Sequence, residues 1–300
     1  MKQALQKLTL PLLRRRAEEE SAGLPALMAN AEKAAHSILT GEHAQRKSGN
    51  GEKFWQFREY DPTDRPQDID WRQSAKSDRI FVRQKEQQTM QTVLFWCAAG
   101  SGMDYSSTPS RPTKQQDAVT VALALAILMK NANEQIGLLD GTMYPGRSDM
   151  ALQIMGQRFL DADSSGDLPV AANIPPHADI ILCGDFLSPP EQIEAALRPL
   201  AARANNGIII QTLDPAELSL PFAGRAIFEE STGAERHHIF HIESIRNAYQ
   251  DKLKDHLSAV KDIGRKCGWH WILHTTDNSV RDTLSAAWTI TSHEQFKVHS

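Results

Sequence analysis

The sequence predicts an α/β protein in which a doubly wound, mostly parallel sheet carries helices on both faces. From residue 92 to residue 290, short runs of β-forming apolar residues alternate with helical segments, a pattern typical of βαβ units. The strand-like runs are continuously apolar, which indicates strands that are covered on both faces. With 300 residues, the chain is long enough for one such domain and additional parts.

The expected strands are short and bounded by polar or turn-forming residues: 92–97, 135–140, 178–184, 207–213 and 269–274. The expected helices are 114–131, 148–160, 189–203, 244–266 and 279–290. The stretch 225–242 is expected to add one or two strands at an edge of the sheet. The longest apolar run, residues 119–129, is too short to span a bilayer and fits a helix buried against the sheet. No membrane insertion is therefore expected.

Three parts are expected along the chain. Residues 1–40 are rich in helix-forming residues and predict N-terminal helices on either side of Pro25. Residues 41–90 interleave aromatic and charged residues between turn signals, which predicts a small β unit. Residues 91–300 form the predicted sheet domain.

Composition limits the possible functions. A net charge of −4 argues against nucleic-acid binding, because neutralising phosphates requires a basic surface. The three cysteines, Cys97, Cys183 and Cys267, form no CxxC pair, so they indicate neither a zinc site nor a disulfide framework. Cys97 and Cys183 lie in apolar runs and are interpreted as buried reduced thiols. Reduced thiols predict a cytoplasmic protein.

Open α/β sheets bind ligands at the carboxyl ends of their strands, which directs attention to residues 98–104 and to Asp185. Gly100, Ser101 and Gly102 resemble part of a phosphate-binding loop, but the third glycine and the immediate helix of that motif are missing. A nucleophile elbow at Ser101 would need glycine at positions 99 and 103, where the chain has alanine and methionine. These departures disfavour both a nucleotide site and a hydrolase.

The histidines give no metal signature. His237, His238 and His241 form the densest group, but their spacing matches no strong zinc motif, and surface or hydrogen-bonded histidines are the favoured interpretation. His270 and His274 alternate with apolar residues on a late strand and are expected to be partly buried structural residues.

Charged and aromatic residues gather between positions 52 and 86. The group comprises Arg58, Glu59, Tyr60, Asp64, Arg65, Asp68, Asp70, Trp71, Arg72, Arg83 and Glu86. The three aspartates do not make a calcium loop, because the glycine and terminal glutamate of that motif are missing. The favoured interpretation is a structural ion network with an exposed docking face.

The same residues carry a family resemblance. The series Arg58-Glu59-Tyr60, Asp64 and Ile69-Asp70-Trp71-Arg72 is similar to the motif of a bacterial family known as domain of unknown function fifty-eight. One departure is Thr63, where that family usually has glycine. The resemblance is specific over residues 41–104 and looser through Lys114 and residues 184–187.

The resemblance implies a von Willebrand A-like domain whose first strand ends in Asp-x-Ser-x-Ser-Met. In the family pattern these side chains, with a threonine and a later aspartate, hold Mg²⁺ and leave a position for a partner's carboxylate. Matching on Met103 places Ala98 at the aspartate position and Gly100 and Gly102 at the serine positions, and Asp185 alone survives. Because Mg²⁺ needs well-placed oxygen ligands, we expect a degenerate site without metal or cofactor.

The resemblance also implies a partnership with MoxR-type AAA+ ATPases in complex maturation or stress response, and no catalytic residue. The leading hypothesis is therefore a non-enzymatic adaptor protein. Two alternatives remain open at this point. One is a metal-dependent ligand-binding module that uses Ser101, Asp104 and Asp185, and the other is a nucleotide-using enzyme centred on residues 100–102.

Overall fold

The computed structural model describes residues 28–39, 54–61, 67, 69–76, 79–85, 91–161, 166–170, 174–229 and 236–297. The chain divides into two compact units. The larger unit consists of Met1–Gly41 and Gln91–Ser300, and the smaller one of Glu42–Met90. None of the helices that the structure describes combines the length and the apolar character that crossing a membrane requires.

The larger unit is built on a parallel sheet of five strands. These are β3 (Thr92–Cys97), β4 (Gln135–Leu138), β5 (Asp179–Gly184), β6 (Gly207–Leu213) and β9 (His270–Thr275). Their order across the sheet is β4-β3-β5-β6-β9, and each neighbouring pair is parallel. The predicted doubly wound α/β fold is confirmed, and it is consistent with a von Willebrand A-like domain.

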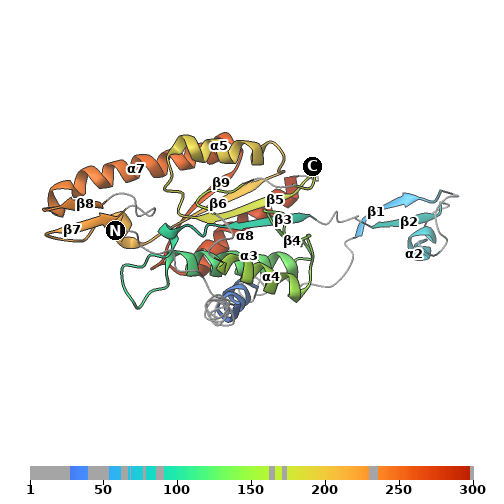
Figure 1. Cartoon of the computed structure of the whole chain (residues 1–300). Helices are drawn as coiled ribbons and strands as arrows, with labels where there is room; N and C mark the ends of the chain where they lie inside the picture. The colour runs from blue at the N-terminus through green and yellow to red at the C-terminus, as the bar shows by residue number, and fades with distance from the viewer. Residues whose placement is uncertain are drawn as a thin grey trace. The chain divides into compact units, whose positions relative to one another are not determined.

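Helices cover both faces of this sheet. They are α3 (Lys114–Asn131), α4 (Asp149–Leu160), α5 (Pro190–Ala201), α7 (Ile242–Lys266) and α8 (Val280–Lys297), with a short α6 (Pro215–Ser219) after β6. Figure 1 shows α5 and α7 on one face and α3, α4 and α8 on the other. Contacts between α5 and α7, and from α3 to α4 and α8, agree with this division. Right-handed βαβ connections produce this alternation of faces.

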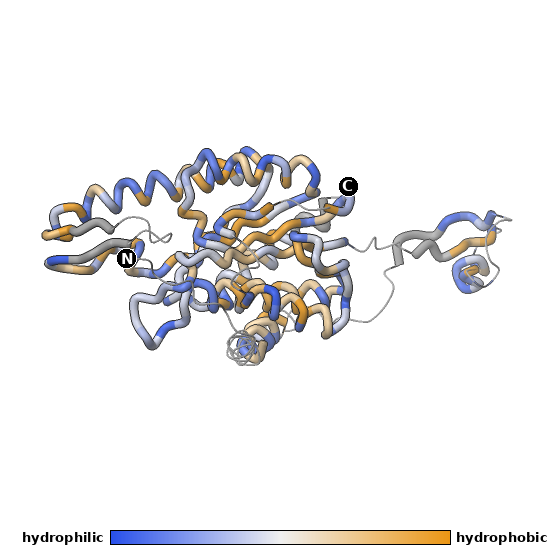
Figure 2. Tube along the Cα trace, viewed as in Figure 1, coloured by the Kyte–Doolittle hydropathy of each residue, from blue (hydrophilic) through white to orange (hydrophobic). Residues whose placement is uncertain are grey.

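Helix α3 is the centre of the apolar core. Its alanine, leucine and valine residues bury nearly every position from Ala118 to Met129, and Figure 2 shows the apolar segments of the sheet and α3 facing each other. Thr113 caps the helix, since its side chain accepts from the N–H of Gln116 while the Gln116 side chain accepts from the N–H of Thr113. Residues 28–39 form a helix that adds Ala31, Ala35 and Ile38 to the same core.

The strand order defines where the chain reverses direction across the sheet. The chain runs from β3 outward to β4 and then returns to the other side of β3 as β5. Doubly wound sheets of this order bind ligands at the carboxyl ends of the two strands that flank the reversal. In this chain those ends lead into residues 98–104 and into Asp185.

One expectation about the sheet is wrong. The stretch 225–242 does not extend an edge of the main sheet. It forms β7 (Ala226–Glu229) and β8 (Arg236–Ile239), which pair antiparallel with each other as a separate two-stranded sheet. Sequence alternation indicates strands, but it does not say which sheet they join.

The smaller unit contains β1 (Phe54–Glu59), the short helix α2 (Trp71–Ser74) and β2 (Phe81–Lys85). The two strands pair antiparallel, and Ile69 makes an isolated bridge to Val82. Asp70 caps α2 through a hydrogen bond of 3.0 Å from the N–H of Gln73 to its Oδ1. The hydroxyl of Ser74 accepts from the N–H of Phe81 and so ties α2 to β2.

Candidate functional site at the carboxyl end of the sheet

A buried lysine lies at the carboxyl end of the sheet. Lys114 is the first residue of α3, and its side chain is only 1% exposed. This is an unusual place for a cation, because burial removes its hydration and the positive end of the helix dipole repels it. Such a residue requires nearby negative charge.

Two carboxylates supply that charge. The Lys114 Nζ donates to Asp185 Oδ2 at 3.0 Å and to Glu217 Oε1 at 2.8 Å. Asp185 directly follows β5, and Glu217 lies in α6 after β6. Both carboxylates are themselves mostly buried, with side chains 12% and 18% exposed. We call Lys114, Asp185 and Glu217 the ammonium cluster.

The protonation of the cluster follows from its geometry. Burial alone would lower the pKa of Lys114, but the charges and hydrogen bonds of Asp185 and Glu217 outweigh it and raise that pKa above its ordinary value. Burial raises the pKa of Glu217 in spite of Lys114, and the charge of Asp185 adds to the rise. The two carboxylates therefore account for the raised pKa of Lys114, and burial accounts for that of Glu217.

The backbone around Asp185 is held in place by a buried glutamine. Gln211 lies on β6, is fully buried, and donates from Nε2 to the carbonyl of Asp185 at 2.7 Å. Its Oε1 accepts from the indole N–H of Trp271 at 3.0 Å. The next residue, Phe186, has a φ of 47°, a left-handed conformation that is costly for a bulky residue. Its carbonyl is paired at 2.7 Å with the His256 ring.

Glu217 is fixed by the cap of its own short helix. Asp214 is the N-cap of α6, and Glu217 Oε2 accepts from the Asp214 N–H at 2.8 Å. The Asp214 carboxylate accepts from the N–H groups of Ser107 and Ala216. Burial alone would raise the pKa of Asp214, but these bonds and the charge of Arg111 lower it. Glu217 therefore connects the Asp214 cap to the ammonium group of Lys114.

Two tyrosines lie in the electrostatic field of the same carboxylates. The pKa of Tyr105 is raised by burial and by the charges of Asp214 and Glu217. Burial, with smaller contributions from Glu217 and Tyr105, raises the pKa of Tyr249 to about 12. Both phenols therefore stay protonated at neutral pH, and neither is prepared to act as a base.

A second buried polar chain lies one turn along α3. His274 on β9 is fully buried, and its Nε2 is 2.7 Å from Asp117 Oδ2. Its Nδ1 is 2.8 Å from the hydroxyl of Thr283 on α8. The three side chains connect α3, β9 and α8 without reaching the surface. Both His270 and His274 were expected to be partly buried, but His274 is fully buried in this chain of bonds, and His270 is exposed.

The loop after β3 contributes little side-chain chemistry. Ala98 is buried, and its N–H bonds to the carbonyl of Cys183, which brings the loop beside β5. Ser101 begins a single 3-10 turn, Ser101–Met103, and both Ser101 and Asp104 are exposed. A Cβ on Gly100 would lie 1.6 Å from Asp167 Oδ1, so the Asp167 carboxylate occupies the space of any larger residue there.

These residues do not fit the Mg²⁺ ion that the family pattern implies. Ala98, Gly100 and Gly102 offer no side-chain oxygen, and the one buried carboxylate beside them, Asp185, is bonded to an ammonium group. Mg²⁺ requires near-octahedral oxygen coordination at about 2.1 Å. Across the part of the chain that the structure describes, no group of three or more acidic, histidine or cysteine side chains is placed to hold a metal.

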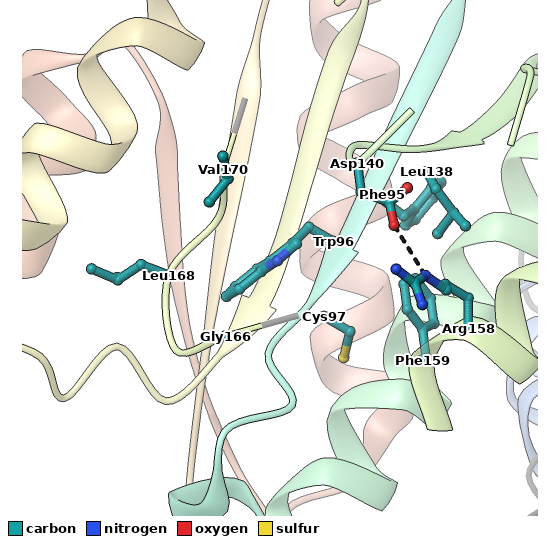
Figure 3. A pocket seen from close by; sticks show the side chains of 10 residues that line it. All are labelled: Phe95, Trp96, Cys97, Leu138, Asp140, Arg158, Phe159, Gly166, Leu168 and Val170. Carbon is teal, nitrogen blue, oxygen red and sulfur yellow. Dashed lines mark hydrogen bonds and ion pairs between the residues drawn. The ribbon is translucent and has the colours of Figure 1, made fainter. Parts of the chain in front are cut away.

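A small cavity lies beside the last residues of β3 and β4. It has a volume of about 130 Å³ and is lined by Phe95, Trp96, Cys97, Leu138, Asp140, Arg158, Phe159, Gly166, Leu168 and Val170 (Figure 3). The Arg158 guanidinium bonds to Asp140 and Asp161 at 3.1 Å each. Burial raises the pKa of the Cys97 thiol well above its ordinary value. The cavity therefore presents no activated nucleophile.

The predicted docking residues of the smaller unit are only partly described. Asp64, Arg65, Asp68 and Glu86 lie outside the described residues, as does the Arg83 side chain. Arg58, Glu59 and Arg72 are exposed, and Glu59 pairs with Arg79. Tyr60 and Asp70 are half-buried. Trp71 stands out, because this large apolar side chain is 66% exposed.

Sequence reasoning found Asp185 but not its partners. Asp117, Gln211, Asp214 and Glu217 were missed, and Lys114 was noted only for its family match. One local signal was present, since Asp214-Pro215 followed by Glu217 is a helix-start pattern. The histidines at 237 and 238 have no described side chains, and His241 is exposed.

Comparison with known proteins identifies relatives across most of the chain. A family model described as "Protein of unknown function DUF58" matches residues 56–259, which include both the smaller-unit motif and the ammonium cluster. Uncharacterized proteins Mb1516 of Mycobacterium bovis and MT1527 and Rv1480 of Mycobacterium tuberculosis are each 26% identical over 267 residues. The match covers 83% of this chain and 81% of each relative. No solved structure matches the chain significantly.

Proposed function

This chain belongs to the family described as Protein of unknown function DUF58, and we propose that it is a non-enzymatic adaptor that binds a protein partner. The observation that carries the proposal is the exposed Trp71 on a short helix whose four residues include no buried one. Tryptophan and arginine dominate the binding energy of protein interfaces, and Arg72 lies next to Trp71 while remaining exposed.

The Trp71 surface is held ready for binding. Asp70 caps α2 through the 3.0 Å bond from the Gln73 N–H, and the Ser74 hydroxyl ties α2 to β2 by accepting from the Phe81 N–H at 2.8 Å. Ile80, also in the smaller unit, is 45% exposed. Because the backbone that carries Trp71 is already fixed, it loses little conformational entropy on binding, which favours affinity.

The chemistry of the larger unit supports a binding role over catalysis. The charged groups of the ammonium cluster are bonded to each other, and the His274 chain is buried from end to end. A general base or nucleophile must reach its substrate and carry a suitable pKa. Neither arrangement offers such a group to a substrate.

The partner we propose is a MoxR-type AAA+ ATPase, with complex maturation or stress response as the process. This step rests on the family resemblance of the motif around Arg58, Tyr60 and Trp71. The partner's nucleotide state would then regulate the complex, because the adaptor itself offers no phosphate-binding loop with the required glycines.

The test is binding of the full chain to a MoxR-type ATPase from the same organism, measured with ADP and with a non-hydrolysable ATP analogue. Trp71→Ala should weaken binding at least about tenfold, the effect of losing an interface hot spot. Tyr144→Ala is the matched control, because Tyr144 is an aromatic residue that is 95% exposed in the larger unit. Circular dichroism checks that both variants fold. Absence of binding in every nucleotide state, or equal effects of the two variants, would contradict the proposal.

A further inference from the structure

We infer that the Lys114 ammonium is a resident cation of the carboxyl-end site, and that it stands beside Asp185 in place of a divalent metal. The inference concerns the chemistry of the larger unit and does not depend on the adaptor proposal. It explains in one step why Ala98, Gly100 and Gly102 stand at the ligand positions of the family pattern and why Asp185 is nevertheless buried there.

The geometry around Nζ is that of a cation site. Two carboxylate oxygens converge on one point from the ends of different strands, at 3.0 and 2.8 Å. They belong to residues that are 71 and 103 positions away from Lys114 in the sequence. Both residues are also anchored independently of Lys114, since Gln211 donates to the main-chain carbonyl of Asp185 and the Asp214 N–H donates to Glu217 Oε2. The fold therefore brings the carboxylates of Asp185 and Glu217 together, and the Lys114 ammonium binds between them.

The energetics assign the cation role to Lys114. Two mostly buried carboxylates repel each other and are expensive to keep ionised unless a cation lies between them. The loop at 98–103 carries no charged residue of either sign. Lys114 reaches this point from the first turn of α3 in spite of the helix dipole, which disfavours a cation there. Attraction to Asp185 and Glu217 outweighs that cost.

An ammonium group in place of a divalent metal changes which partner groups the site can bind. A bound divalent metal with an open coordination position can accept a carboxylate oxygen from a partner. The ammonium cluster sums one positive and two negative charges to a net charge of −1, and its cation is 1% exposed. A partner carboxylate is therefore neither attracted nor given a ligand position. Binding at this face must be independent of divalent metal.

The decisive experiment removes the Lys114 ammonium from between the two carboxylates in the full-length chain. Lys114→Ala removes the ammonium and leaves the carboxylates of Asp185 and Glu217 without their cation, and carboxylates are the hard oxygen ligands that Mn²⁺ prefers. The matched control is Lys130→Ala, which removes a lysine from the last turn of the same helix, where it pairs with Asp149 near the surface. Mn²⁺ binding is followed by electron paramagnetic resonance and by thermal unfolding.

We expect wild type and Lys130→Ala to show no Mn²⁺ binding that depends on Asp185. Lys114→Ala should bind Mn²⁺, with an unfolding temperature raised by about 3 °C at ten times the Kd. Adding Asp185→Asn to Lys114→Ala should abolish both effects. Mn²⁺ binding by wild type that Asp185→Asn removes would overturn the inference, as would a folded Lys114→Ala variant that binds no metal.

A measurement on the wild-type chain covers the case in which Lys114→Ala does not fold. An ammonium held by two buried carboxylates exchanges its protons slowly, so selective ¹⁵N labelling of lysine side chains should give a protected ¹⁵Nζ resonance at neutral pH. Asp185→Asn should shift or broaden that resonance, and Lys130→Ala should leave it unchanged. A wild-type spectrum without a protected lysine resonance would overturn the inference by itself.

Discussion

The charged side chains of Lys114, Asp185 and Glu217 pair with one another inside the protein, at the carboxyl end of the sheet. The Lys114 ammonium is paired with Asp185 and Glu217 rather than with water, because its side chain is only 1% exposed. A buried ion pair contributes little net stability when intact, but removing one member leaves the other charge unpaired at high cost. This asymmetry makes the cluster easy to probe by mutation.

Lys114→Met should lower the free energy of unfolding by about 3–5 kcal/mol, because the apolar volume is kept while Asp185 and Glu217 lose their cation. Lys130→Met should cost less than about 1 kcal/mol, since the Asp149 side chain that it pairs with is 85% exposed. Urea denaturation at pH 7 measures both. Equal losses for the two variants would show that the cluster is not a buried ion pair in solution.

The buried thiols predict a loss of stability in alkali. Burial raises the pKa of Cys183 from 9.0 to about 12. Between these values the unfolded thiol has released its proton while the folded one keeps it, so stability falls as the pH rises. The loss due to Cys183 at pH 10 is about 1.4 kcal/mol. Cys183→Ala should therefore show a shallower decline in unfolding free energy between pH 8 and pH 10 than wild type does. Parallel declines would contradict the burial of this thiol.

At the residue scale, sequence reasoning located the functional end of the sheet but not its chemistry. Residues 98–104 and Asp185 were found because carboxyl ends of strands are predictable from the strand pattern. The partnership with Lys114 was not, because it joins positions 71 residues apart and gives no local spacing signal. The alanine and glycines at the ligand positions of the family pattern were visible in the sequence, but the bond between Lys114 and Asp185 was visible only in three dimensions.

At the scale of elements, α3 organises the larger unit. It is buried on nearly every side and also supplies Lys114 and Asp117 from its first turn. Asp117 connects it through His274 to β9, and Thr283 extends this chain to α8. The helix is therefore held by apolar packing along its length and by directional polar bonds near its start.

Thr283→Val tests the polar connection, because valine keeps the shape of threonine and removes the hydroxyl that bonds to His274 Nδ1. An unsatisfied buried nitrogen costs about 1–3 kcal/mol. The control is Thr289→Val on the same helix, where the exposed hydroxyl bonds only to the backbone of Ser285, and it should change stability by less than about 0.5 kcal/mol. Thermal unfolding of both variants measures the difference. A Thr283→Val variant as stable as its control would show that the chain of side chains is not formed.

Elements with strong periodic signals were predicted well. The strands at 92–97 and 207–213 and the helix at 114–131 have the bounds that their apolar runs indicate. The short helix α6 was missed, since five residues carry too little periodicity to be recognised. The pairing of β7 with β8 in a sheet of their own was also missed, because a strand pattern does not reveal its neighbour.

At the scale of the whole molecule, the chain combines two units with different chemistry. The larger one has an extensive apolar core that draws on residues 28–39 and on residues from 93 onward. The smaller one has Val82 buried and presents Trp71 and Ile80 to solvent. The sequence predicted a small β unit over residues 41–90, and the structure adds that β1 and β2 pair antiparallel there.

This division predicts that folding and partner binding can be separated. Among the residues that the structure describes, none between positions 39 and 92 belongs to the apolar core cluster, so replacing residues 42–90 with a flexible Gly/Ser linker removes no described part of that core. A linker adds only a small loop-closure cost, because each doubling of its length costs about 0.6 kcal/mol. The shortened chain should unfold cooperatively and keep the protected Lys114 resonance, yet it should no longer bind the ATPase.

Differential scanning calorimetry measures whether the shortened chain unfolds cooperatively, and the binding assay used for the full chain measures whether it still binds the ATPase. A shortened chain that still binds the ATPase would move the interaction to the larger unit, and one that fails to unfold cooperatively would show that residues 42–90 are needed for its core.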